Sequence, residues 1–253
     1  MNSEITAQKL WILSQYIYPL DQVPDPVALF PLNGAYGTEE INGRVSQGIP
    51  SEVNRAEGPK GQADGSYEFY GTGSYIEFTN SAGEALDVRH SMTMLCWLYY
   101  GGQDGPIFDY EGNGSSWGVH LWLSAGQLYV DFKHRDYSDS NILEHTTLGS
   151  VWRFVGTSYD QTSGEAKLWV DGVEALTSNI GAGLELATDS NIRMGARIGD
   201  ARYFKGRIAQ MRIYNVALTQ DDIQQIQNQV TGEIISTGHF IQFLEKQLLK
   251  KSV

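Results

Sequence analysis

The sequence predicts an all-β protein, a two-sheet antiparallel sandwich with a helical extension at each end. Three observations support this. Short apolar or alternating runs follow one another over residues 25–230, separated by Gly, Asn or Asp. The 28 Gly and 14 Tyr favour tight turns and strands, and 41% hydrophobic residues are enough to bury a core. A chain of 253 residues with this pattern commonly forms one main domain.

Residues 1–24 are predicted to be a helical arm and a connector. Apolar residues recur at helical spacing before Pro19: Ile5, Leu10, Leu13 and Ile17. The connector DQVPDP has two prolines within three residues, which disfavour both helix and sheet pairing. The arm lacks the basic start and the cleavage site of a signal peptide, and it is too short and polar to cross a bilayer.

The sandwich is predicted over residues 25–230. Ten runs are candidate strands: 27–34, 66–78, 92–100, 106–112, 117–124, 127–134, 152–159, 166–172, 191–199 and 206–215. The run 92–100, MTMLCWLYY, is apolar on both faces and is expected at the centre of a sheet. In the last run, strict alternation would place Ile208, Gln210 and Arg212 on one face. Runs at this spacing are typical of a sandwich or jelly roll.

Two helices are predicted after the last strand. Thr219 precedes Asp222 by three residues, as in a helix N-cap, and Ile223 and Ile226 continue at helical spacing. Residues 231–253 form a separate amphipathic helix with lysines at its C-terminal end. This helix and the N-terminal arm either pack on the sandwich or pair between copies, and we expect a homo-oligomer.

Charge and composition narrow the classes of partner. The net charge of −12 repels nucleic acid and anionic membranes, so cations such as calcium and neutral ligands are favoured. Cys96 is the single cysteine, so no disulfide can form within the chain, and its apolar run predicts an inert buried thiol. The five histidines lack the spacing of a zinc site.

Two acids, Asp160 and Asp171, stand at the ends of strand-like runs. Asp171 precedes Gly172, and Asp-Gly is a strong signal for a hairpin turn. We therefore predict that both carboxylates bond nearby backbone and turn the chain rather than serve chemistry.

Three segments carry a family resemblance. Residues 149–172, GSVWRFVGTSYDQTSGEAKLWVDG, combine a Trp-led strand, a Tyr-Asp corner and a strand ending in WVDG. They resemble laminin-G-like jelly rolls of the concanavalin A-like superfamily. Residues 63–78 with 91–100, and residues 202–223, are similar to other strands of that family and to its closing helix, so the resemblance covers roughly residues 27–228. It is specific for the fold and not for the function.

The resemblance implies two antiparallel sheets of six or seven strands, an extracellular location, and adhesion or recognition of glycans and proteins. Residues 30–44, 105–123 and 193–208 resemble the domains of marine-invertebrate extracellular and skeletal-matrix proteins. Relatives often bind calcium at one rim through an Asp of the closing strand. Ala209 and Gln210 stand there in this chain, so the inherited site would be weaker.

The segment FDYEGNG is the sharpest candidate site. Asp109, Glu111 and Asn113 would project from one face of a strand, and Trp117 follows closely. These residues are candidate ligand contacts, and Asp109 and Glu111 with Gln210 are candidate calcium ligands. Glycan hydrolases of this superfamily carry three acids on a strand, whereas this segment has two and turns at glycines. An ordinary solvated loop is the other interpretation.

Residues 131–141, DFKHRDYSDSN, form a second candidate. His134, Asp136, Tyr137 and Asp139 place an aromatic ring among polar groups, which suits sugar binding and also suits any exposed hairpin.

The sequence thus predicts a non-catalytic recognition or adhesion module that binds a glycan or an extracellular protein through rim loops, with calcium as a possible aid. The alternatives are a self-assembling scaffold that uses its terminal helices and a glycan hydrolase of the same fold.

Overall fold

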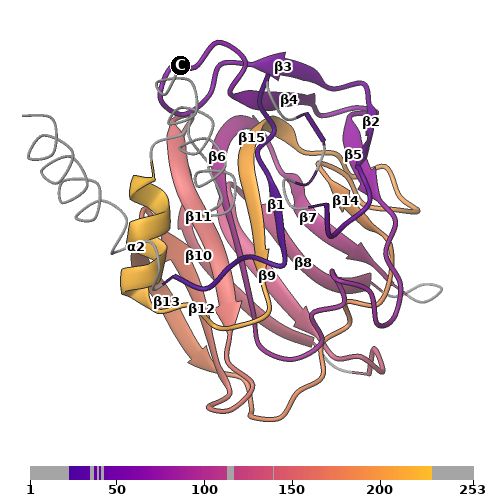
Figure 1. Ribbon diagram of the computed structural model, residues 1–253, viewed down its shortest axis with the longest axis vertical. Coiled ribbons are helices and arrows are strands. Elements are labelled where there is room, and N and C mark those ends of the chain that lie inside the picture. Colours follow the sequence, from indigo (N-terminus) through magenta and orange to yellow (C-terminus); the bar gives the residue numbers. More distant parts are fainter. Residues whose placement is uncertain are drawn as a thin grey trace, which may run out of the picture.

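The structure is a computed structural model that describes residues 23–34, 37–38, 40, 43–112, 117–138 and 140–229. The predicted terminal helices fall outside these residues, so their packing and the expected homo-oligomer remain predictions. The described residues form two antiparallel sheets that face each other, which confirms the predicted sandwich (Figure 1). No helix among the described residues is long and apolar enough to span a membrane.

Sheet A has eight strands. Their spatial order is β13 (Val173–Asn179), β12 (Glu165–Val170), β11 (Trp152–Tyr159), β6 (Met92–Gln103), β15 (Lys205–Tyr214), β4 (Ser66–Tyr70) and β3 (Asn54–Ala56), with β1 (Ala28–Phe30) also paired to β15. The apolar run predicted to be central is β6, and it lies between β11 and β15.

Sheet B has seven strands. Their spatial order is β10 (Ser140–Thr147), β9 (Gln127–Lys133), β8 (Trp117–Ser124), β7 (Gly105–Glu111), β14 (Ile192–Met194), β5 (Tyr75–Phe78) and β2 (Ile49–Ser51). Four of these strands, β7 to β10, follow one another in the chain and form a continuous antiparallel meander.

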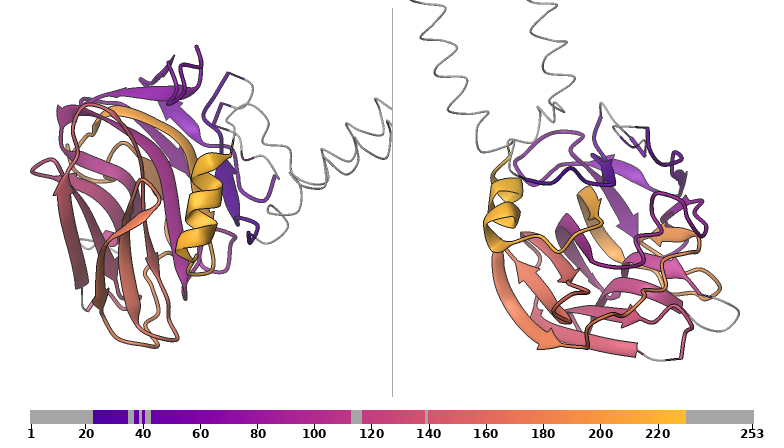
Figure 2. Two further views of the ribbon diagram at one scale, coloured as in Figure 1. Left: turned by 90° about the vertical axis from the view of Figure 1, so that its left-hand side faces the viewer. Right: turned by 60° about the horizontal axis from the view of Figure 1, so that its bottom comes forward.

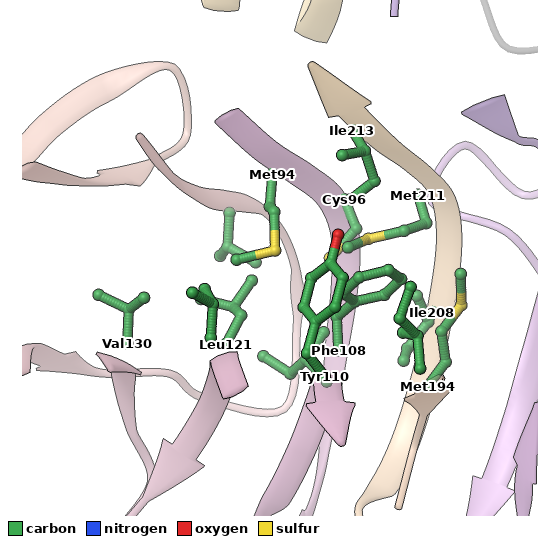
Figure 3. Packing of buried hydrophobic residues seen from close by; sticks show 14 of the residues in the cluster. Met94, Cys96, Phe108, Tyr110, Leu121, Val130, Met194, Ile208, Met211 and Ile213 are labelled. Carbon is green, nitrogen blue, oxygen red and sulfur yellow. The ribbon is translucent and has the colours of Figure 1, made fainter. Parts of the chain in front are cut away.

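The core lies between the two sheets (Figure 3). Met94 and Cys96 of β6 meet Phe108 and Tyr110 of β7, and all four are fully buried. Burial raises the pKa of the Cys96 thiol to about 12, which keeps it protonated and inert, as predicted.

A β-bulge interrupts the two-residue alternation that the sequence predicts for β15. Gln210 has a positive φ of 52°, and the pairing with β6 shifts between Ala209 and Arg212. The extra residue brings Ile208 and Met211 onto the same face, and both lie in the core. A strict two-residue period therefore fails at this point of the strand.

Helix α2 (Gln220–Asn228) packs on the outer face of sheet A (Figure 2). It begins at Thr219, whose side chain accepts a hydrogen bond from the Asp222 backbone N–H, while the Asp222 carboxylate accepts one from the Thr219 N–H, so the predicted N-cap is confirmed. Ile223 and Ile226 cover a second apolar cluster on that face.

The two acids predicted to turn the chain do so. Asp171 has φ 52°, and its carboxylate accepts a hydrogen bond from the Phe154 N–H at 3.1 Å. The Asp160 carboxylate accepts one from the Thr162 N–H at 2.9 Å. Both carboxylates accept hydrogen bonds from backbone N–H groups beside a turn, as predicted, and that of Asp171 also forms an ion pair with Arg153.

Candidate ligand-binding site

A row of side chains crosses four strands on the outer face of sheet B. In β7, Phe108 and Tyr110 point into the core, so Asp109 between them points outward. Asp109 pairs with His120 of β8, His120 with Asp131 of β9, and Asp131 with Ile142 of β10. Directly opposed residues share a face of a sheet, so the four side chains stand side by side.

The row continues across β7 in the other direction. Asp109 pairs with Arg193 of β14, which pairs with Glu77 of β5. The Arg193 guanidinium donates to the Glu77 carboxylate at 2.7 Å and lies 4.1 Å from the centre of the Tyr75 ring. On this side of Asp109, the row therefore consists of an ion pair, Arg193 with Glu77, beside an aromatic ring.

Asp109 is the most enclosed charged group of the row, with 0% of its surface exposed. The Arg197 Nε lies 3.6 Å from its Oδ2, and the His120 Nδ1 lies 3.6 Å from its Oδ1. Neither oxygen accepts a hydrogen bond from the described residues. Burial raises the pKa of Asp109 to about 7, although the Arg197 charge opposes this shift.

Arg197 forms the centre of an aromatic stack. Its guanidinium carbon lies 4.2 Å from the ring centre of Trp117 and 4.2 Å from that of Trp122, both at the distance of a cation–π contact. Arg197 belongs to a short hairpin in which Ala196 bridges Tyr203. This hairpin, residues 196–203, therefore lies over the outer face of sheet B.

His120 completes the floor beneath the stack. Its ring is stacked on Tyr129, with centroids 5.8 Å apart and planes at 19°, and it meets Trp122 edge-on. Burial lowers the pKa of His120 to about 4. The ring is therefore neutral at pH 7 and adds no positive charge to the site.

A hollow of about 360 Å³ opens beside Trp122. On one wall, the Asp104 Oδ1 accepts hydrogen bonds from the Tyr100 hydroxyl at 2.9 Å and the Gly126 N–H at 2.8 Å. On another wall, Arg202 lies 5.7 Å from the Trp122 ring with 62% of its side chain exposed. The hollow thus has an aromatic wall, a fixed acceptor and an accessible donor.

Comparison with known proteins identifies the family. A family model described as the concanavalin A-like lectin/glucanases superfamily matches residues 70–224, more than half of the chain. The chain belongs to the concanavalin A-like superfamily. No curated protein sequence matches it significantly. The closer resemblance to marine-invertebrate matrix domains stays a prediction.

Solved structures share this concanavalin A-like fold at low identity. The receptor-binding domain of a botulinum neurotoxin C/D mosaic serotype is 15% identical with a TM-score of 0.63, over 83% of this chain and 53% of that one. Domain 4 of an extracellular arabinanase from Geobacillus stearothermophilus, in complex with arabinotriose, is 16% identical with a TM-score of 0.59, over 82% and 100%. The chain spans about half the length of the toxin domains. At these identities the likeness shows the fold alone.

The first candidate segment of this concanavalin A-like domain is only partly brought together. Asp109 and Trp117 both contact Arg197, whereas Glu111 is half-buried at the end of β7 beyond a β-bulge. Asn113 lies outside the described residues. Gln210 lies in sheet A, so the three candidate calcium ligands are divided between two sheets. Among the described residues, no three His, Cys, Asp or Glu side chains cluster as metal ligands.

The second candidate segment lies at the turn between β9 and β10. His134 Nε2 is 3.0 Å from the Asn141 side-chain amide, and Asp136 accepts two hydrogen bonds from Ser138. The Tyr137 hydroxyl donates to Asp189 at 3.3 Å. Asp139 lies outside the described residues. The side chains are thus engaged in holding the turn.

A larger hollow of about 710 Å³ lies near that turn, and Arg135, Asp87 and His90 are among its lining residues. Arg135 forms a two-pronged ion pair with Asp87, at 2.6 and 3.0 Å. The polar groups of this hollow are therefore largely satisfied within the fold.

Sequence reasoning missed most residues of the site, among them His120, Trp122, Arg197 and Arg202. A signal for two of them was present, because the run GVHLWL puts His120 and Trp122 on the same face of a strand. The two arginines lie in the Gly-containing segment MGARIGDARY, whose fold over sheet B has no local sequence signature.

Proposed function

We propose that this chain is a non-catalytic module that binds a glycan on the outer face of sheet B. The observation that carries the proposal is Trp117, a residue that is 39% exposed while Arg197 stacks on its ring. The apolar face of a sugar ring packs well on an exposed indole, and an amphipathic aromatic ring is a common anchor in binding sites.

The stack makes this indole a rigid platform. Arg197 is held between two rings, and the buried Asp109 carboxylate attracts its charge from below. A side chain that is already ordered loses little conformational entropy when a ligand binds. The platform is therefore suited to a weakly interacting ligand such as a sugar.

Hydrolysis fits the site less well than binding. Asp109 has no exposed surface and lies under Arg197, so a glycosidic oxygen cannot approach it. Asp131, the next acid of the row, stands two strands away, which is about 10 Å at ordinary strand spacing, far from the about 5 Å of a retaining pair and just beyond the about 6.5–9.5 Å of an inverting pair. Its carboxylate also accepts a hydrogen bond from Ser140 at 2.5 Å.

The candidate calcium ligands do not form a calcium site. Asp109 faces the cationic Arg197, which would repel a metal ion, and Gln210 lies on the other sheet. Since calcium requires six to eight oxygen ligands, these residues do not fit the ion that the family resemblance implies.

A glycan is favoured over a protein partner by the shape of the site. The hollow beside Trp122 has the volume of a small ligand site, about 360 Å³. The other exposed large apolar side chains are spread over both sheets and a loop instead of forming one patch: Ile49, Tyr70, Ile142, Val151 and Val173. We also propose that the protein acts outside the cell, which is typical of laminin-G-like domains.

Calorimetric titration with neutral oligosaccharides tests the proposal, with arabinotriose included because the related arabinanase domain carries it. Trp117→Ala is expected to weaken binding about thirtyfold, the effect of losing about 2 kcal/mol at an aromatic anchor. Trp152→Ala is the matched control, because Trp152 is a half-exposed tryptophan of sheet A, and it should leave the affinity unchanged. Equal losses in the two variants would contradict the proposed site.

A further inference from the structure

We infer that the glycan bound at this site is uncharged, an inference that rests on the proposed function and names its ligand class. The first ground is that the cations of the site already have acidic partners. Arg193 is paired with Glu77 at 2.7 Å, Arg197 with Asp109 at 3.6 Å, and Arg202 with Asp200 at 3.5 Å. Each of these three arginines therefore has a carboxyl group beside it, which offsets the attraction of its charge for an anionic sugar.

The second ground is an excess of negative charge. Asp104 lines the hollow and Asp131 continues the row, and neither forms an ion pair within the described residues. The whole chain also carries a net charge of −12. An approaching carboxylate or sulfate therefore meets both local and long-range repulsion.

The third ground is the hydrogen-bonding pattern of the hollow. The Arg202 terminal nitrogens have no hydrogen-bond partner in the described part of the chain and can donate. The Asp104 Oδ2, whose neighbour Oδ1 takes both hydrogen bonds, can accept, and Ser124 can do either. Sugar hydroxyl groups donate and accept, so a mixed set of this kind matches them.

The two parts of the site are close enough for one short oligosaccharide. Trp122 contacts Arg197, which stacks on Trp117, and the same Trp122 ring forms a wall of the hollow. One sugar ring stacks on Trp117, and the hydroxyls of a neighbouring ring enter the hollow between Arg202 and Asp104.

Matched pairs of trisaccharides test the charge of the ligand. The probes are arabinotriose, cellotriose, mannotriose and galactotriose, the last three each beside its carboxylated counterpart, the triuronate with the same linkage. Affinities are measured at about 10 mM and about 300 mM salt, where the Debye length changes from about 30 Å to less than 8 Å. We expect a neutral probe to bind and its triuronate to bind at least about tenfold more weakly at low salt. This difference in affinity should become smaller at high salt.

Two variants test which residues of the hollow distinguish the neutral probe from the acidic one. Asp104→Asn should narrow the gap between the neutral and the acidic probe at low salt, because it removes a negative charge of the hollow. Arg202→Gln should weaken the neutral probe by about three- to tenfold, because it removes the accessible donor. The exposure of Arg202 predicts an unchanged melting temperature for this variant, which separates loss of contact from misfolding.

The outcomes are distinguishable. A triuronate that binds as tightly as its neutral partner, or more tightly and with affinity that falls in salt, overturns the inference and leaves the proposed function standing. If no trisaccharide of the panel binds, both the inference and the proposed function are overturned. If Trp117→Ala binds a neutral probe as tightly as the wild type does, the proposed location of the site is overturned.

Discussion

The substitution Asp109→Asn gives the sharpest test of the buried charge at the site. Burial raises the pKa of Asp109 to about 7 from an ordinary value of 3.8. Between these pH values the folded protein holds a proton that the unfolded chain has lost, so the group stabilises the fold in acid and this stabilisation is lost as the pH rises to 7. At 1.36 kcal/mol per pH unit, the loss is about 4 kcal/mol.

Asparagine cannot titrate, so the variant escapes this loss. Its free energy of unfolding, relative to that of the wild type, should therefore rise by about 4 kcal/mol between pH 4 and pH 8. His120 acts in the opposite sense, because burial lowers its pKa to about 4 and the unfolded state alone binds the proton between about pH 4 and pH 6.5. The two contributions nearly cancel in the wild type, and the variant keeps only that of His120.

Urea unfolding followed by tryptophan fluorescence at a series of pH values measures this difference. Glu111→Gln, which removes a half-buried acid of the same strand, is the matched control and should show a much smaller change. A difference between Asp109→Asn and the wild type that stays constant within about 1 kcal/mol from pH 4 to pH 8 would refute the assignment of a buried, poorly solvated carboxylate.

Three further substitutions test other parts of the structure by urea unfolding. Arg197→Met leaves the buried Asp109 without its cation and raises the pKa of this carboxyl further, so the variant should lose about 1 kcal/mol more at pH 8 than at pH 5, where Asp109 is protonated in both proteins; a loss independent of pH would be unexpected. Gly156→Ala drives a Cβ into the Met94 carbonyl oxygen and should destabilise the fold by about 2 kcal/mol or more, so an unchanged midpoint contradicts the strand packing. Thr219→Ala removes the N-cap of α2 and should cost about 1 kcal/mol, and no loss would show that α2 contributes little to stability.

Most of the fold could be predicted because its determinants are local. The apolar run of β6, the Asp-Gly turn at Asp171 and the N-cap at Thr219 each carry a sequence signature with a direct physical cause. The two-residue alternation predicted for β15 was wrong because of the bulge at Gln210. This bulge depends on how β15 pairs with the neighbouring strand β6, and no local sequence pattern records that pairing.

The site was predicted less well because it is assembled from distant segments. The sequence pointed to Asp109 and Trp117, but their meaning comes from Arg197, which lies some eighty residues further along the chain and folds back between two rings. Their spacing on one strand predicted that Asp109 and Glu111 would contact the same bound ligand. A buried guanidinium instead gives Asp109 a partner of opposite charge and covers it.

The indole N–H signals of the six tryptophans in a 15N-labelled sample provide the most direct test of glycan binding on sheet B. On titration with an oligosaccharide that binds, the signals of Trp117 and Trp122 should shift together, and those of Trp152 and Trp169 on sheet A should stay in place. Shifts confined to the sheet A tryptophans, or binding that moves neither Trp117 nor Trp122, would contradict the account.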